Sequence, residues 1–164
     1  MSAADETRFV ALLQSHQKIL YKIVNGYCRQ PADRDDLLQE IVIAGWQSFA
    51  RFDERVRFST WLYRVAMNVA ISFYRRERRR QQHHVPLPAT LDFAAADRAM
   101  AAAPDELQRL YAAIRELPDL DRALVLLYLD EQSHDEIALA LGLTVTNVST
   151  RLSRIKQKLK EQTR

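Results

Sequence analysis

The amino-acid sequence predicts an all-α protein made of two small helical domains joined by a flexible linker. Glycine and proline occupy only three and five of the 164 positions, which is too few for the turns of a β-sandwich or barrel. Apolar residues make up 48% of the chain, enough to pack helical cores, and they recur at helical spacing. Residues 81–103 lack this periodicity and separate residues 1–80 from residues 104–164.

The linker, residues 81–103, is rich in alanine and glutamine and is bracketed by prolines. It contains one candidate helical turn near residues 97–102. At about 3.3 Å per residue it reaches roughly 75 Å when extended, so the two domains need not touch.

The first domain is predicted to begin with a helix over residues 5–28 that is broken near residues 14–17. Asp33 or Asp35 can cap the next helix, which runs to about Phe49, because a side-chain oxygen there satisfies an unpaired N-terminal amide. Two apolar stripes run along this helix, namely Leu38, Ile41, Gly45 and Phe49 in one and Leu37, Val42 and Trp46 in the other. One of these faces is therefore available to a partner.

A third long helix is predicted from Ser59 or Thr60, either of which can cap it, to about Arg80. Its buried stripe consists of apolar side chains at helical spacing, namely Leu62, Val65, Ala66, Val69, Ala70 and Phe73. Its opposite face carries a ridge of basic and hydrogen-bonding side chains, namely Arg64, Asn68, Ser72, Arg75 and Arg76. Taken alone, the ridge indicates either nucleic-acid binding or a solvated basic helix end.

The second domain is predicted to begin with two short helices. Pro104 begins the first, because a residue without an N–H fits the first helical turn, and Asp105 and Glu106 follow it. Pro118 ends that helix, and residues 120–129 form the next one.

The rest of this domain matches the helix–turn–helix pattern. Ser133 and Glu136 form a Ser-x-x-Glu capping box that opens a short helix, and Gly142 ends it in a left-handed turn. Thr144 caps the last helix, which runs to about Glu161. The exposed face of this helix is polar and then basic, with Thr146, Asn147, Thr150, Arg151, Arg154 and Lys158. Short polar side chains reach base edges and cations hold phosphate, so this face favours DNA binding over a merely solvated surface.

Charge is segregated along the chain, although the formal net charge is only +3. Residues 1–80 carry 14 basic and nine acidic side chains, and residues 105–141 carry three basic and nine acidic ones. The last 23 residues carry six basic and one acidic. Two basic regions therefore flank an acidic one, and basic clusters of this kind attract phosphate.

Catalysis and metal binding are not indicated by the sequence. His16 and His134 are isolated, His83 and His84 lie together in the linker, and no Gly-rich phosphate loop or zinc-ligand spacing occurs. Cys28 is the single cysteine, which we interpret as a small buried apolar residue. We therefore expect no enzyme, no metal and no cofactor. The absence of a secretory signal pattern and of a membrane-length apolar run predicts a cytoplasmic protein that does not insert into membranes.

Two stretches of the sequence resemble the sigma-70 superfamily of bacterial RNA polymerase subunits. Region two is matched by Asp35-Asp36-Leu37-Leu38-Gln39-Glu40, Trp46, Arg51-Phe52-Asp53, Phe58-Ser59-Thr60-Trp61-Leu62-Tyr63-Arg64-Val65-Ala66 and Asn68. Region four is matched by Leu117-Pro118, Leu129, Glu136-Ile137-Ala138, Leu141-Gly142-Leu143, Val148 and Arg151-Leu152-Ser153-Arg154. Because both regions occur in this order without the extra regions of larger members, the chain is similar to the extracytoplasmic-function (ECF, group four) sigma factors.

The resemblance implies an alternative sigma factor that binds core RNA polymerase and directs initiation at specific promoters. It assigns core-polymerase binding to Asp36, Leu37, Gln39, Glu40 and Ile43. It assigns recognition and melting of the minus-ten element to Phe52, Arg57, Phe58, Ser59, Thr60, Trp61, Arg64, Asn68, Arg75 and Arg76. It assigns recognition of the minus-thirty-five element to Thr146, Asn147, Thr150, Arg151, Arg154 and Lys158. Members of this family are often held inactive by an anti-sigma factor, which is therefore an expected partner.

Four positions depart from the common family pattern. Ser72 stands where Asp is frequent, Thr144 where Pro is frequent, Asn147 where Thr is common and Ser149 where Lys is common. Asparagine suits adenine edges, so position 147 can alter base preference. Two other functions stay open, namely a helix–turn–helix regulator that acts without the polymerase and a sigma-like decoy that binds partners but opens no promoter.

Overall fold

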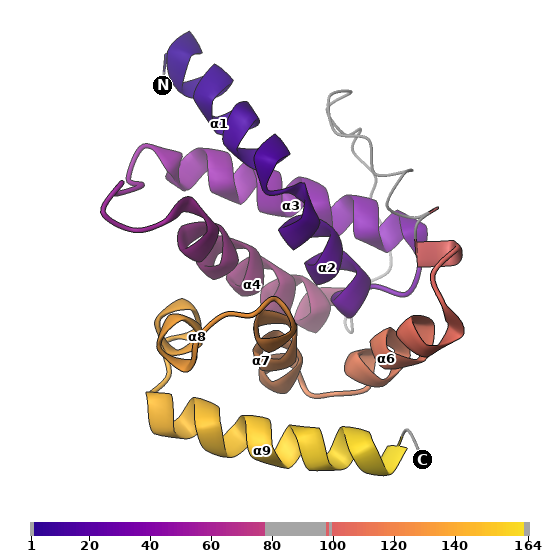
Figure 1. The fold of residues 1–164 in the computed structure, drawn as a ribbon. Coiled ribbons are helices and arrows are strands. Elements are labelled where there is room, and N and C mark those ends of the chain that lie inside the picture. The colour runs from indigo at the N-terminus through magenta and orange to yellow at the C-terminus, as the bar shows by residue number, and fades with distance from the viewer. Residues whose placement is uncertain (1, 78–97, 99, 163–164) are drawn as a thin grey trace.

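The computed structural model describes residues 2–77, 98 and 100–162, and the regular structure in this part of the chain is entirely helical. The first domain contains four helices, α1 (Ala3–Ser15), α2 (Gln17–Tyr27), α3 (Pro31–Phe49) and α4 (Phe58–Glu77) (Figure 1). The second contains α6 (Asp105–Arg115), α7 (Asp119–Leu129), α8 (His134–Leu141) and α9 (Val145–Gln162). The predicted all-α class is confirmed. Most of the predicted linker lies outside the described residues, but residues 98, 100 and 101 of its candidate turn are helical.

The predicted break in the first helix lies at His16, between α1 and α2. The φ angle of His16 is −115°, which ends α1, and its ring Nδ1 lies 2.8 Å from the Leu12 carbonyl oxygen. The chain continues directly into α2, which packs against α3 and α4 and also against α6 and α7.

The prediction that Asp33 or Asp35 caps α3 is wrong. The helix begins earlier, at Pro31, and its N-cap residue Gln30 makes no side-chain capping bond. A proline at the first helical position has no N–H that requires a partner and already holds a helical φ angle. The start of α3 therefore needs no aspartate cap.

The prediction that Ser59 or Thr60 caps α4 is also wrong. This helix begins at Phe58, and the Arg57 carbonyl accepts the hydrogen bond from the Trp61 amide. Thr60 is buried inside the first domain. A buried aromatic residue, rather than a hydroxyl, thus marks the first turn of α4.

The helix–turn–helix unit of the second domain is built as predicted. The Ser133 hydroxyl accepts a hydrogen bond from the Glu136 amide at 3.2 Å, and Glu136 Oε2 accepts one from the Ser133 amide at 2.8 Å. Gly142 ends α8 with a left-handed φ of 67°. Thr144 Oγ1 accepts a hydrogen bond from the Asn147 amide at 3.1 Å, which caps α9.

The core of the first domain forms where α2, α3 and α4 meet. Its fully buried side chains are apolar, and include Leu20, Ile23, Leu38, Ile41, Leu62 and Met67. Cys28 is buried, as predicted. At the other end of this domain, the rings of Phe9, Trp46, Phe49, Phe52, Phe58 and Trp61 form an aromatic cluster with neighbouring centroids 5.1–6.0 Å apart.

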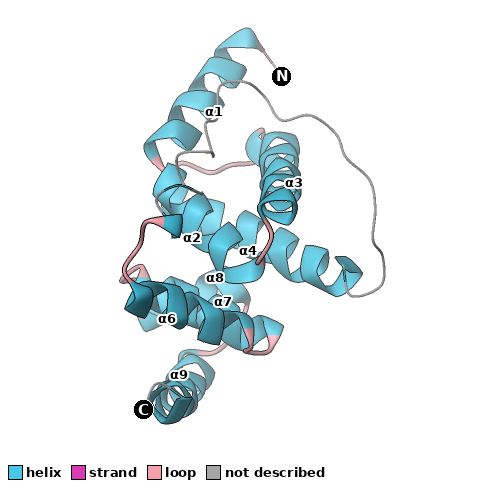
Figure 2. Cartoon of the chain, turned by 90° about the vertical axis from the view of Figure 1, so that its right-hand side faces the viewer, coloured by secondary structure: helices cyan, strands magenta, loops and turns pink. Residues whose placement is uncertain are grey.

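The two domains pack against each other, a contact that the linker length alone did not require. Helix α7 contacts α2 and α4 on one side and α9 on the other, while α8 contacts α4 (Figure 2). The two domains approach closely at Gly26 of α2, where a Cβ atom would lie 2.6 Å from Leu126 Cδ1 of α7. We call this contact of α2 and α4 with α6, α7 and α8 the interdomain seam.

Candidate nucleic-acid and polymerase interface

The predicted polymerase-binding residues lie on α3, on a face that the interdomain seam leaves accessible. Ile43 is 48% exposed and offers an apolar side chain on this face. Asp36, Gln39 and Glu40 are partly exposed, and the Glu40 carboxylate pairs with Arg76 of α4. Leu37 is fully buried, so in this structure its side chain supports the helix from inside the core. Of the five predicted residues, Asp36, Gln39, Glu40 and Ile43 therefore lie at the surface, and Leu37 supports the helix from the core.

The predicted minus-ten residues divide into two groups along α4. The cations and the amide form an exposed ridge, namely Arg57, Arg64, Asn68, Arg75 and Arg76. The aromatic residues belong to the cluster at the start of the helix, where Phe58 is buried and Phe52 and Trp61 are half-buried. Thr60 is buried and Ser59 is half-buried. In this structure Phe58 and Thr60 are therefore buried supports of the site and expose little surface to solvent.

The turn that precedes α4 is ordered by Asp53. Its Oδ1 accepts a hydrogen bond from the Arg55 amide at 3.0 Å, and the Arg55 guanidinium bonds the same carboxylate at 2.9–3.1 Å. These hydrogen bonds lower the pKa of the Asp53 carboxyl below its usual value. A turn with this geometry leaves Val56 and Arg57 exposed beside the aromatic cluster. An apolar platform next to cations suits an unstacked base and its phosphate.

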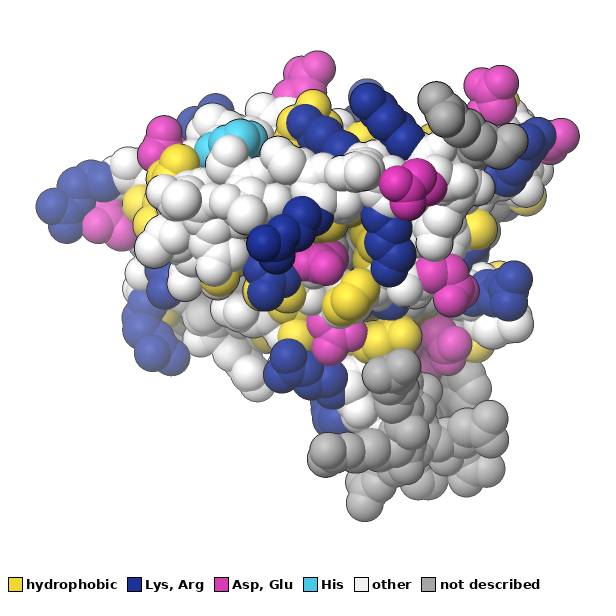
Figure 3. All heavy atoms as spheres, turned by 90° about the horizontal axis from the view of Figure 1, so that it is seen from below, with side chains coloured by type: hydrophobic (Ala, Val, Ile, Leu, Met, Phe, Trp, Pro, Cys, Tyr) yellow, Lys and Arg dark blue, Asp and Glu magenta, His cyan; other side chains and the backbone are white. Residues whose placement is uncertain are grey.

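The predicted minus-thirty-five residues share the outer face of α9. Val148, Leu152 and Ile155 anchor the helix in the second domain, which turns Thr146, Asn147, Thr150, Arg154 and Lys158 outward. Arg151 is only half-exposed, because its Nη1 lies 2.7 Å from Asp121 Oδ1 of α7. On the face of the molecule seen from the α9 side, Lys and Arg side chains are interspersed with acidic ones (Figure 3).

Replacing Arg154 by alanine is expected to lower the salt dependence of DNA binding. An exposed arginine that neutralises one phosphate releases about one counterion, so the slope of log K against log salt should fall by about 1. The measurement is a titration of promoter duplex by fluorescence anisotropy at several salt concentrations. Lys18→Ala, an exposed cation on α2, is the matched control, and an equal change in both variants would contradict a phosphate contact at Arg154.

Sequence analysis missed the acidic partners of these cations. Glu40, Asp119, Asp121 and Glu136 pair with Arg76, Arg75, Arg151 and Arg57, respectively. Glu40 had been assigned a role in binding a partner protein and Glu136 a role in capping, but no acid had been paired with a cation. The signal that could have found the pairs of Asp119, Asp121 and Glu136 is the acidic segment between two basic ones, since opposite charges in one chain pair when it folds.

The part of the chain that the structure describes contains no group of three His, Cys, Asp or Glu side chains able to hold a metal ion. Within the same residues, no helix is both long and apolar enough to cross a membrane. The candidate surface is therefore defined by cations, amides, hydroxyls and aromatic rings.

Comparison with known families identifies the family to which this chain belongs. Residues 12–80 match the family model for Sigma-70 region 2, and residues 107–159 match the model for Sigma-70, region 4. The chain belongs to the sigma-70 family. The first match includes α2, α3 and α4 but only the end of α1, the second lies within the second domain, and residues 81–106 belong to neither.

Relatives place this sigma-70 family chain in the ECF group. It is 28% identical to the RNA polymerase sigma factor NccH of Alcaligenes xylosoxydans, over 94% of the chain and 86% of NccH. It is 26% identical to the ECF RNA polymerase sigma factor SigW of Bacillus subtilis, over 98% of the chain and 91% of SigW.

Two solved structures share the arrangement of helices. CnrH in complex with the cytosolic domain of CnrY matches with a TM-score of 0.68 and 25% identity, over 96% of this chain and 88% of CnrH. The sigma factor RpoE of Bartonella quintana, in complex with the anti-sigma factor NepR, has the same fold with a TM-score of 0.69, over 98% of this chain and 96% of RpoE. Its identity is 17%.

Proposed function

We propose that this chain is a promoter-specificity subunit of bacterial RNA polymerase, an ECF-type sigma factor. The observation that carries the proposal is the presence of both sigma-70 regions in one chain, in order, each folded as a helical domain. A helix–turn–helix regulator that acts without the polymerase would need the second domain only. The sigma factor relatives also argue for a regulatory initiation factor rather than an enzyme.

In this function, α3 docks on core RNA polymerase through Asp36, Gln39, Glu40 and Ile43. The exposed apolar side chain of Ile43 supplies area to bury, and the surrounding polar groups supply specificity. Leu37 acts from the core by holding the helix in place. Because the polymerase and its promoter are in the cytoplasm of a bacterium, the chain is expected to act there.

Promoter opening in this scheme is driven by binding. The face of α9 reads duplex DNA at the minus-thirty-five element, while the ridge on α4 holds the backbone of the minus-ten element. The aromatic cluster at the start of α4 then offers a stacking surface to one unpaired base, which offsets the free energy of unpairing. None of these steps requires nucleotide hydrolysis by this chain.

An anti-sigma factor is the regulatory partner that we infer. The two solved structures described above each hold a second protein, the cytosolic domain of CnrY in one and the anti-sigma factor NepR in the other. A protein that covers α3 or α9 would block the polymerase or the promoter.

A reconstituted run-off transcription assay tests the proposed function. Core RNA polymerase with this chain and a pool of genomic promoter fragments is expected to give transcripts with defined start sites and shared upstream motifs. Binding to core without initiation would favour the decoy. Failure to bind core at all would favour the polymerase-independent regulator.

Arg151→Ala is expected to weaken binding to the promoter duplex by about 1–3 kcal/mol, because a side chain that reaches a base edge contributes that much. Binding of the same variant to core polymerase should be unchanged, since α9 is remote from α3. Electrophoretic mobility shifts measure the first quantity and co-elution with core polymerase the second. Unchanged duplex affinity would show that α9 is not the reading helix.

A further inference from the structure

A cavity of about 250 Å³ lies at one end of the interdomain seam, where residues of α4 and α6 flank the end of α2. Its walls include the rings of Phe73 and Tyr74 and the side chains of Cys28 and Ala112. An apolar protein cavity of about 150 Å³ is large enough to bind benzene. The space therefore admits one aromatic ring that carries a small substituent.

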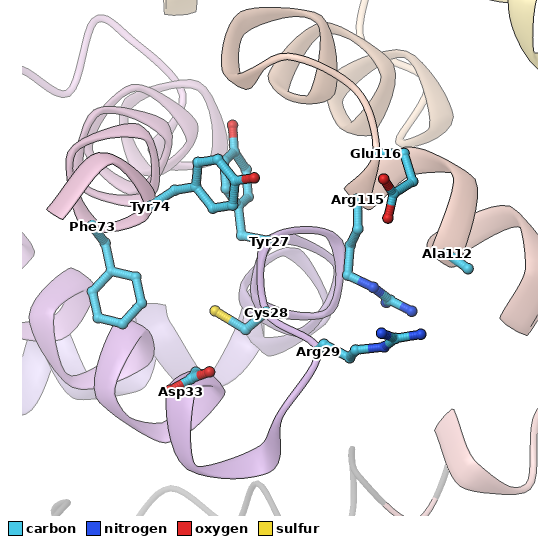
Figure 4. A pocket seen from close by; sticks show the side chains of 9 residues that line it. All are labelled: Tyr27, Cys28, Arg29, Asp33, Phe73, Tyr74, Ala112, Arg115 and Glu116. Carbon is cyan, nitrogen blue, oxygen red and sulfur yellow. The ribbon is translucent and has the colours of Figure 1, made fainter. Parts of the chain in front are cut away.

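Two arginines line the same cavity. Arg29 follows α2 and is exposed, whereas Arg115 of α6 is half-buried. Their side chains extend in the same direction (Figure 4), and the charge of Arg29 acts on Arg115. Arg115 Nη1 donates a hydrogen bond to the Asn25 carbonyl at 3.0 Å, which holds this guanidinium at the end of α2. Within the described residues, the Arg29 side chain makes no hydrogen bond or ion pair, so its donors are available to a ligand.

The positive charge at this end of the seam extends beyond the two arginines. Arg122 is fully buried, and its Nη2 donates to the carbonyl oxygens of Arg115 and Leu117. Its Nε and Nη1 have no hydrogen-bond partner among the described residues. The pKa of Arg115 is lowered first by burial and then by the charges of three neighbouring arginines, namely Arg34, Arg29 and Arg122. Cations that disfavour one another's charge in this way are stabilised by an anion bound among them.

The two acids of the cavity leave its arginines without a carboxylate partner. Asp33 and Glu116 both line the cavity. Neither acid forms an ion pair in the part of the chain that the structure describes, and neither Arg29 nor Arg115 forms one there. Arginines of α4 and α9, by contrast, pair with carboxylates of this chain. The guanidinium groups of the cavity are therefore open to an anion from outside the chain.

We propose that this cavity is a binding site for a small organic anion, a carboxylate or phosphate carried on a flat apolar group, held by Arg29 and Arg115. Guanidinium groups bind both kinds of oxyanion through paired N–H donors. The rings of Phe73 and Tyr74 contact the apolar group of the ligand. The inference is independent of the proposed function, because no residue that lines the cavity belongs to the predicted polymerase or DNA sites.

A ligand in this cavity joins the two domains, because its walls come from both. Cys28 and Phe73 belong to the first domain, and Ala112 and Arg115 belong to the second. A molecule that binds only the folded arrangement stabilises it by mass action. Ligand at about ten times its dissociation constant should therefore raise the melting temperature by about 3 °C in differential scanning fluorimetry.

An NMR titration of the full-length chain with benzoate tests the site. Amide signals of residues 27–33 and 112–116 should shift, with a dissociation constant of about 1 mM, since so small a ligand makes few contacts. Benzamide, the uncharged analogue, is the matched control ligand and should bind about tenfold more weakly or not at all. Phenyl phosphate should shift the same signals. Tighter binding of phenyl phosphate than of benzoate would support a phosphate ligand, and the reverse order would support a carboxylate.

Arg29→Gln is expected to weaken benzoate binding about tenfold, which is the smaller end of the contribution of a hydrogen bond to a charged group. Because Arg29 is exposed, the variant should fold as the wild type does. Arg109→Gln is the matched control, since it removes an exposed cation of α6 that does not line the cavity. An equal loss in both variants would show an effect of net charge and overturn the site.

Ala112→Phe tests the cavity without changing any charge. The added ring occupies the apolar part of the space, so benzoate binding should weaken about tenfold or more although both arginines remain. Circular dichroism should show unchanged helix content. Wild-type affinity in this variant would place the anion on the outer surface and overturn the assignment to the cavity.

Three further results would overturn the proposal. Equal binding of benzamide and benzoate would show an apolar cavity that does not select an anion. Inorganic phosphate that binds as tightly as phenyl phosphate would show that the apolar walls contribute nothing. The absence of shifts at about 20 mM benzoate, well above the expected dissociation constant, would show that there is no site. Run-off transcription is not part of these measurements, so each of these results leaves the proposed function to its own test.

Discussion

Glu40→Lys is expected to weaken binding to core RNA polymerase by at least about 30-fold, or about 2 kcal/mol, which is the smaller end of the effect of an unpaired charge at a protein interface. Glu40 lies on α3 beside the exposed Ile43, and its only ion pair among the described residues is with Arg76. Exposed pairs of this kind contribute little to folding, so the free energy of unfolding should change by less than about 1 kcal/mol. Surface plasmon resonance with immobilised core polymerase measures the binding.

Two control variants separate the polymerase contact from the ion pair. Arg76→Ala removes the same pair but keeps the carboxylate, and it should bind core polymerase normally. Glu54→Lys reverses an exposed charge in a different pair, with Arg8, and should also bind normally. A comparable loss in Arg76→Ala would mean that Glu40 acts through the fold of the domain and not through contact with the polymerase.

Ile41→Ala is expected to lower the free energy of unfolding of the first domain by about 2–5 kcal/mol. Ile41 is fully buried between helices, and truncation of such a side chain removes apolar burial and leaves a cavity. Both tryptophans, Trp46 and Trp61, lie in the first domain, so tryptophan fluorescence during urea denaturation reports on this domain. The midpoint should shift to lower urea with little change in slope.

Ile43→Ala is the matched control, because it makes the same substitution two positions along the same helix. Ile43 is 48% exposed, so its truncation should leave the unfolding free energy within about 0.5 kcal/mol of wild type. The same variant should lose affinity for core polymerase, by about 1 kcal/mol or more. Equal destabilisation by both variants would contradict the division of α3 into an inner and an outer face.

The elements that could be predicted from sequence are those fixed by local chemistry. Ser133, Glu136, Gly142 and Thr144 determine the limits of α8 and α9 through hydrogen bonds within three residues and one left-handed φ angle. The start of α3 was not predicted correctly, because the sequence offers Asp33 and Asp35 as caps, whereas Pro31 begins the helix without one. Local signals of similar strength compete at a helix start, and the backbone geometry of the proline decides the outcome.

The sequence named candidate site residues, but it did not show which of them lie on the surface and which lie in the core. The resemblance named Leu37, Phe58 and Thr60 alongside exposed residues, because family positions do not distinguish a contact from a support. The packing of the two domains could not be inferred, since it depends on the fit of Gly26 to Leu126, two residues 100 positions apart. The sequence shows that an acidic segment lies between two basic ones. Only the folded structure shows that acids of this segment pair with arginines of the basic segments.

The two carboxylate oxygens of Glu136 make two different contacts. Oε2 accepts the capping bond from the Ser133 amide, whereas Oε1 pairs with Arg57 of the other domain. The capping bond does not depend on the second contact, so the start of α8 is fixed within its own domain. In the proposed function, α9 is therefore already folded when it meets the minus-thirty-five element, so binding must order side chains but need not fold the helix. Its discrimination between promoters should then reside in the dissociation rate of each complex rather than in a folding step.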